Sequence, residues 1–149
     1  MYKLQNTHEI DYCIIGEEMQ CVEIELDPAE TVIAEAGSLM MMDSEIQMET
    51  VFGDGFKVEQ SFMGKVFSAG KRVLTGESLF MTAYSNSGHE KRHVTFAAPY
   101  PGKVIPLDIA ALGGKVICQK DAFLCAAQGT SIGIEFQKRL GAGLFGGDN

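Results

Sequence analysis

The chain has 149 residues and a formal net charge of −8, with 46% hydrophobic and 21% charged residues. This length suits one domain, and the composition is that of a globular protein rather than a disordered or fibrous one. No stretch supplies the ~20 apolar residues that a membrane-spanning helix needs, and residues 1–11 lack the pattern of a signal peptide. We therefore expect one soluble, cytoplasmic domain without a membrane span.

Short strand patterns separated by turns run along most of the chain. From Gln20 to Leu26, apolar and polar side chains alternate in the manner of a half-buried strand. Asp27 to Glu30 then forms a predicted turn, and a last alternating strand is predicted from Thr130 to Phe136. Short strands at this spacing predict an all-β sandwich or barrel of antiparallel strands. Further turns are predicted at Asn86-Ser87-Gly88, Pro99-Tyr100-Pro101-Gly102, Gly113-Gly114 and Gln128-Gly129.

One segment departs from the strand pattern. Val58, Phe62 and Val66 recur at every fourth position, which predicts a short amphipathic helix near residues 57–68. Gly64 weakens this helix by roughly 1 kcal/mol relative to alanine. The helix would cover an open end of the β core, or it would offer a surface for a partner or for peripheral membrane contact.

A faint internal repeat supports the β prediction. The turn-entering residues Ser38, Ser78 and Ala122 are spaced by 40 and 44 residues, and each follows a pair of branched apolar residues. Each unit reads as two strands around a turn, so the repeat predicts hairpins that share one core. We expect residues 1–138 to form a single β domain and residues 139–149 a glycine-rich tail.

Motifs that would indicate catalysis or metal binding fail on their context. Residues 129–133 match the G-x-S-x-G nucleophile pattern, but Ser131 opens a predicted strand and no histidine follows it. Residues 141–146 match G-x-G-x-x-G, yet too little chain follows for the required helix. His89 and His93 would lie about 13 Å apart on a strand, too far to share one ion. The sequence indicates no enzyme, no cofactor and no metal.

The four cysteines do not form a C-x-x-C pair, so we expect buried, reduced thiols. Only the fold can decide whether Cys118 or Cys125 meets His8 or His93 to form a nucleophile and base. Two disulfides are the alternative, since the count is even. The cysteines are Cys13, Cys21, Cys118 and Cys125.

Charge is distributed unevenly. Residues 1–60 carry 14 acidic and 2 basic residues, a net charge of −12, whereas residues 61–149 carry 6 acidic and 10 basic residues, a net charge of +4. The acidic part repels nucleic acid, and the chain has no tryptophan and no interleaved aromatic and basic residues, so nucleic acid is not an expected partner. Opposite charges favour head-to-tail self-association, although a solvated acidic face is the commoner cause of such a pattern.

Several blocks together resemble a known family. They are Ala36–Met42, Gly76–Met81, Pro99–Leu107 and, later, Asp121–Leu124. In this order they are similar to the family named for altered inheritance of mitochondria, member twenty-four type, over most of residues 15–147. This family is widespread in bacteria and largely of unknown function. The resemblance implies an all-β fold of the tryptophan-binding RNA attenuator kind, a pseudo-repeated β sandwich that tends to oligomerise, and it carries over no catalytic residue.

These features predict a non-enzymatic scaffold or binding protein that associates with itself through its β surface. Family members usually continue beyond residues 143–147, and a shortened fold would leave strand edges for another copy to cover. We therefore expect a homo-oligomer, with a trimer as a guess, and a protein partner as a further option. The alternatives are a small-molecule or RNA-binding module and an uncharacterised hydrolase. The candidate interface residues are Gly76, Glu77, Ser78, Leu79, Phe80, Phe62 and Phe67.

Overall fold

The structure is a computed structural model that describes residues 9–53 and 80–133. The predicted helix near residues 57–68 lies outside the described residues, as do the boundary at residue 138 and the C-terminal tail. No helix in the described ranges is long and apolar enough to cross a membrane. The elements are β1 (Asp11–Ile15), β2 (Cys21–Leu26), β3 (Thr31–Ala34), the 3₁₀ helix η1 (Ala36–Ser38), β4 (Leu39–Met42), β5 (Ile46–Phe52), β6 (Phe80–Asn86), β7 (Arg92–Ala97), the 3₁₀ helix η2 (Lys120–Ala122) and β8 (Cys125–Ala127).

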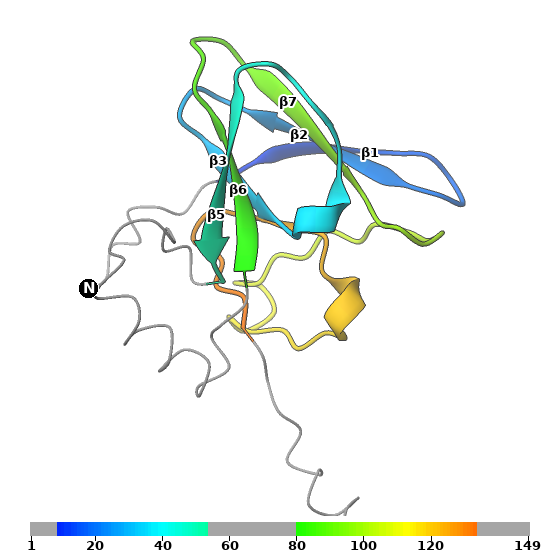
Figure 1. Ribbon diagram of the computed structural model, residues 1–149. Helices are drawn as coiled ribbons and strands as arrows, with labels where there is room; N and C mark the ends of the chain where they lie inside the picture. The colour runs from blue at the N-terminus through cyan, green and yellow to red at the C-terminus, as the bar shows by residue number, and fades with distance from the viewer. Residues whose placement is uncertain (1–8, 54–79, 134–149) are drawn as a thin grey trace, which may run out of the picture.

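The strands form two four-stranded sheets. The first has the order β1-β2-β7-β4, and the second has the order β5-β6-β3-β8. Every pair of neighbouring strands within residues 9–53 and 80–133 is antiparallel. The two sheets pack against each other without closing into a barrel (Figure 1). The all-β prediction is confirmed, and of the two predicted forms the sandwich is the one observed.

The core lies between the sheets, and the alternation in β2 builds one side of it. Ile24 pairs with Val94 of β7, and Val22 pairs with Phe96, so all four side chains point inward. The second sheet contributes Tyr84, whose ring packs edge-on against Phe96 with centroids 5.1 Å apart. Desolvation by burial raises the pKa of the Tyr84 hydroxyl above its ordinary value, so the phenol stays neutral.

The second sheet is covered on both faces. Ile33, Val51 and Met81 form a smaller cluster on its outer face, and Phe123 and Ile132 pack against that cluster. β3 is therefore buried at all four positions, as is expected of a strand covered on both sides. The segment around residue 123 therefore covers part of the outer face of the second sheet.

The chain passes between the two sheets at both ends of the sandwich, and at the pocket end it does so through η1. The turns from β2 to β3, from β4 to β5 and from β6 to β7 all pass from one sheet to the other at the same end, at the top of Figure 1. We call these turns (residues 27–30, 43–45 and 87–91) the crossover end. β3 and β7 finish at the opposite end, and β8 begins there. We call the segments at residues 35–38, 98–100 and 121–124 the pocket end.

The predicted turns are found, but the last predicted strand is wrong over its described part. At the first turn, the Glu30 amide donates to the Asp27 carbonyl at 3.0 Å. Thr130 to Gly133 form no strand, and the rest of that prediction lies outside the described residues. The Ile132 amide donates to the Gly53 carbonyl at 2.8 Å. Ile132 packs against the outer cluster of the second sheet, but its segment does not pair with a strand.

Candidate functional site

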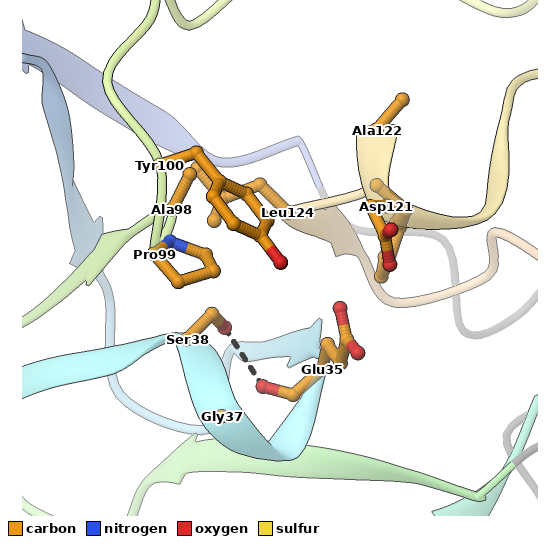
Figure 2. Close-up of a pocket in the computed structure, with 10 residues that line it drawn as sticks. Glu35, Gly37, Ser38, Ala98, Pro99, Tyr100, Asp121, Ala122 and Leu124 are labelled. Carbon is orange, nitrogen blue, oxygen red and sulfur yellow. Dashed lines mark hydrogen bonds between the residues drawn. The ribbon is translucent and has the colours of Figure 1, made fainter.

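A pocket of about 220 Å³ opens at the pocket end of the sandwich (Figure 2). Three segments far apart in the sequence line it: one follows β3, one follows β7 and one precedes β8. Because antiparallel neighbours place the end of one strand beside the start of the next, these segments meet. The lining residues are Glu35, Gly37, Ser38, Ala98, Pro99, Tyr100, Asp121, Ala122, Phe123 and Leu124.

Two 3₁₀ helices of similar backbone geometry form opposite sides of the pocket. In η1, the Ser38 amide donates to the Glu35 carbonyl at 3.1 Å; in η2, the Ala122 amide donates to the Gln119 carbonyl at 3.0 Å. Both helices lead directly into extended residues, Leu39 and Phe123. Ser38 and Ala122 are equivalent positions in the predicted repeat, so the repeat has a structural counterpart at these two turns.

The repeat does not extend to the residues before η2. Val32 and Ile33 lie in β3 and are buried, whereas Val116 and Ile117 form no strand and are exposed. The middle unit lies outside the described residues. The two described units therefore share their turn but not their first strand.

The polar groups of the pocket sit above an apolar floor. Figure 2 shows the carboxylates of Glu35 and Asp121 and the hydroxyl of Tyr100 directed toward one shared space. Phe123 and Leu124 give the pocket its apolar lining, which we call its floor; Leu124 packs against the core between the sheets and Phe123 against the outer cluster. Among the side chains that the structure describes, neither carboxylate has a basic partner. The arrangement is suited to binding a small group rather than to forming part of the core.

Ser38 has a structural role in this pocket. Its side chain is buried, and its hydroxyl donates to the Glu35 carbonyl at 2.7 Å. This bond closes η1 and fixes the backbone from which Glu35 projects. The described lining of the pocket contains no histidine or cysteine, and the Ser38 hydroxyl is already engaged with the backbone. The described residues also hold no group of three histidine, cysteine or acidic side chains that would bind a metal.

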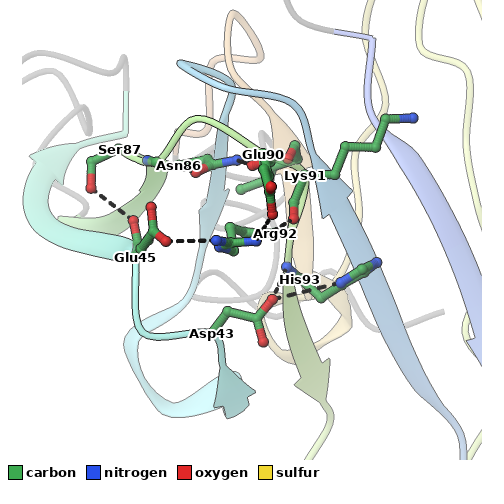
Figure 3. A network of polar contacts seen from close by, with 10 residues as sticks. Asp43, Glu45, Asn86, Ser87, Glu90, Lys91, Arg92 and His93 are labelled. Atoms are coloured by element: carbon green, nitrogen blue, oxygen red, sulfur yellow. Dashed lines mark hydrogen bonds and ion pairs between the residues drawn. The ribbon is translucent and has the colours of Figure 1, made fainter.

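The crossover end carries a denser polar network, shown in Figure 3. Asn86 is 2% exposed and joins the turns: its side-chain amide donates to the Leu26 carbonyl at 2.9 Å and to the Glu90 carbonyl at 2.7 Å. Its side-chain oxygen accepts from the Gly88 amide at 2.9 Å. Asn86 ends β6 of the second sheet and Leu26 ends β2 of the first, so the bond between them links the two sheets.

Arg92 and His93 complete this network. Arg92 lies 2.6 Å from the Glu45 carboxylate, a hydrogen bond that raises the pKa of the guanidinium further above its ordinary value. The two ring nitrogens of His93 lie 3.5 Å from Glu25 and 3.6 Å from Asp43. His93 is on β7, and its ring faces these two carboxylates.

The cysteine predictions are partly wrong. Cys13 and Cys118 are exposed, because Cys13 is on the edge strand β1 and Cys118 is in an extended segment. The described cysteines are free thiols. Burial raises the pKa of Cys125 to about 12, so this thiol stays protonated at neutral pH and is a poor nucleophile. Cys125 is in the second sheet and His93 in the first, and no hydrogen bond joins them among the described contacts.

Most of the predicted interface residues lie outside the described residues; these are Gly76, Glu77, Ser78, Leu79, Phe62 and Phe67. Phe80 opens β6, is 61% exposed and lies with its ring 5.4 Å from that of Phe52. Its exposure is compatible with an interface, which stays a prediction.

A second exposed feature is the segment between the pocket residues Tyr100 and Asp121. We call residues 103–118 the apolar arm, because large apolar side chains along it lie open to solvent. Ile105 is 73% exposed and Ile117 is 68% exposed, and Leu107 and Leu112 are also exposed. Met40, Met41 and Met42 form a separate exposed apolar row on β4.

Sequence reasoning missed the pocket, although a signal for it was present. Parts of the blocks Ala36–Met42, Pro99–Leu107 and Asp121–Leu124 make up most of its lining. The signal that these blocks carry is their resemblance to a family. Nothing in their spacing along the chain indicates that they meet.

The two packed sheets define a β-sandwich domain, and a pocket opens at one of its ends. The family described as Mitochondrial biogenesis AIM24 matches residues 12–149. The chain belongs to this family, which confirms the resemblance drawn from the sequence blocks.

A solved structure has a similar fold. The crystal structure of protein SPYM3_0169 from Streptococcus pyogenes matches with a TM-score of 0.54 and 20% sequence identity, over 80% of this chain and 50% of that chain. The chain thus spans about half the length of that protein, and the likeness concerns the fold alone. No curated protein matches the chain.

Proposed function

We propose that this chain is a non-enzymatic binding protein that holds a small group in the pocket between η1 and η2 and associates with itself through its apolar arm and β surface. The observation that carries the binding role is the meeting of three distant segments around one cavity. That cavity has polar groups on its rim and an apolar floor, the arrangement typical of ligand sites.

The size of the cavity favours a group rather than a whole cofactor. Ligand pockets for drug-sized molecules commonly measure roughly 300–1,000 Å³, and this pocket measures about 220 Å³. A side chain of a partner or a small metabolite would fit that space. A binding role is also favoured over hydrolysis, because the Cys125 thiol has a raised pKa and the Ser38 hydroxyl is used within η1.

Self-association is supported by the exposed apolar arm. Soluble monomers seldom expose large contiguous apolar surfaces, and such surfaces commonly mark interfaces. Met40, Met41 and Met42 on β4 are exposed apolar residues as well. The arm of one copy against β4 of a second would cover apolar surface on both copies.

The binding role is tested by nuclear magnetic resonance titration of the full chain with small amines, carboxylic acids, sugars and nucleotides. We expect one class to shift amide signals in residues 35–38, 98–100 and 121–124. Tyr100→Ala should weaken the binding that causes the shifts, and Tyr12→Ala, which changes an exposed tyrosine on β1, should leave it unchanged. Shifts that map elsewhere, or none with any class, would reject the proposed role of the pocket.

Self-association is tested by light scattering at high micromolar concentration. The wild-type chain should form an oligomer, and Ile105→Glu together with Ile117→Glu should reduce its mass toward that of a monomer. Met48→Glu places the same charge at an exposed site on β5 and should leave the oligomer intact. A wild-type monomer would contradict the proposal.

A further inference from the structure

We infer that the pocket selects an organic cation, an ammonium or guanidinium group seated between Glu35 and Asp121 against the ring of Tyr100. This inference rests on the proposed binding role of the pocket and names the chemistry of its ligand. It follows from the charge, the aromatic ring and the apolar lining of the cavity, to which all three lining segments contribute.

The charge of the rim is negative on two sides. Glu35 immediately precedes η1, and Asp121 lies within η2, so the hydrogen bonds that close the two turns fix the backbones that carry them. Figure 2 shows both carboxylates directed into the same space. No basic side chain that the structure describes neutralises them. A cation between two carboxylates removes their mutual repulsion and pairs with both, whereas an anion would be repelled.

The aromatic rim adds a second feature that suits a cation. Tyr100 is exposed and presents its ring beside the carboxylates. Ammonium and guanidinium groups are attracted to the faces of aromatic rings. The Tyr100 hydroxyl, directed into the same space, can also accept a hydrogen bond from such a group.

The floor distinguishes an organic cation from a metal ion. Pro99, Phe123 and Leu124 line the pocket with apolar surface, against which the aliphatic stem of a lysine-like or arginine-like group can lie. Calcium takes six to eight oxygen ligands and magnesium needs an octahedron of them. The described part of the pocket offers two carboxylates, and the described residues hold no group of three metal-binding side chains.

The test is a nuclear magnetic resonance titration of the full chain with matched probes. N-acetyl-lysine methylamide and N-acetyl-arginine methylamide supply the cation on an amino acid. N-acetyl-norleucine methylamide has a similar stem without charge, and n-butylamine represents a free small amine. Calcium chloride is titrated separately. We expect the cationic probes to shift the pocket signals and the norleucine probe to bind at least about tenfold more weakly, because it lacks both ion pairs and the cation–π contact.

Three variants separate charge from shape. Glu35→Gln and Asp121→Asn should each weaken the cationic probes about fivefold, and Tyr100→Leu should do so about threefold. Glu90→Gln is the matched control, because Glu90 has an 80% exposed side chain and lies at the crossover end. It should leave binding unchanged. Raising the salt concentration should weaken the cationic probes, since exposed charges are screened.

The outcomes separate this inference from the proposed function. If the lysine and norleucine probes bind equally, and Glu35→Gln changes neither affinity, the preference for a cation is rejected. The proposed binding role of the pocket would still hold. Binding of calcium without binding of amines would also overturn the inference, in favour of a metal site. A pocket that no probe of any class reaches would overturn both. If the amino-acid probes bind more tightly than butylamine, the cation is a basic side chain of a partner protein. If butylamine binds more tightly, the cation is a free amine.

Discussion

The crossover end and the pocket end of the sandwich use polar residues in opposite ways. At the crossover end, Asn86 satisfies groups on two turns, and Arg92 pairs with Glu45. At the pocket end, the rim carboxylates of Glu35 and Asp121 have no basic partner among the described side chains. Buried polar groups with partners hold a fold together, whereas unpaired groups around a cavity remain available to a ligand.

The largest expected effect is a loss of stability when Asn86 of the crossover end is replaced. Asn86→Ala removes three hydrogen bonds and leaves the Leu26 and Glu90 carbonyls and the Gly88 amide without this partner. We expect a loss of about 3 kcal/mol in the free energy of unfolding, measured by urea denaturation. Ser87→Ala alters an exposed neighbour that bonds only the Glu45 carbonyl through its hydroxyl, and it should cost under about 1 kcal/mol. Similar losses in both variants would show that Asn86 does not join the turns.

The reactivity of the Cys125 thiol reports how well the floor of the pocket excludes solvent. Cys125 follows the floor residue Leu124, and burial raises its pKa to about 12. At pH 8, we expect iodoacetamide to alkylate Cys125 at least about a hundredfold more slowly than exposed Cys118, because the thiolate is the reacting form. Mass spectrometry of peptides measures both rates. Equal rates would mean that the floor opens to solvent.

The raised pKa of Cys125 also predicts an alkaline loss of stability. The ordinary thiol pKa is 9.0 and the folded value is about 12, so the unfolded chain loses its proton first as pH rises. The contribution of Cys125 is therefore fully present below pH 9 and is lost between about pH 9 and pH 12. Cys125→Ala should flatten this part of the curve of unfolding free energy against pH. An unchanged slope in the variant would contradict the burial of the thiol.

The smallest expected effect is on stability at the pocket rim. Glu35→Gln and Asp121→Asn should each change the free energy of unfolding by less than about 0.5 kcal/mol, because both side chains are exposed and unpaired among the described residues. Urea denaturation of these variants beside Asn86→Ala sharpens the contrast between the two ends. A loss as large as that of Asn86→Ala would assign the carboxylates to the fold rather than to a ligand.

The parts of the fold that could be predicted are those with local signals. The alternation in β2 places Val22, Ile24 and Leu26 inward because successive side chains on a strand point to opposite faces. The turn at residues 27–30 was readable from proline and acidic residues. The same logic failed at Thr130 to Gly133, where Ile132 is held by packing on the second sheet and not by strand pairing.

The candidate site was outside the reach of such local signals. Glu35, Tyr100 and Asp121 are separated by tens of residues, and each lies in a short irregular segment with no diagnostic pattern. The repeat predicts equivalent turns at Ser38 and Ala122. It does not predict that these turns face each other across a pocket. The exposure of Cys13 and Cys118 likewise depends on which strand and segment the neighbouring chain leaves uncovered.

The class of fold, the inward faces of the strands and the family can all be recognised in the amino-acid sequence. The reason is that periodicity, turn residues and contiguous blocks are properties of short segments. Only the packing of the two sheets places Glu35, Tyr100 and Asp121 around one pocket. The reason is that strand order brings distant segments together, and no property of a single segment encodes its neighbours across the sheets.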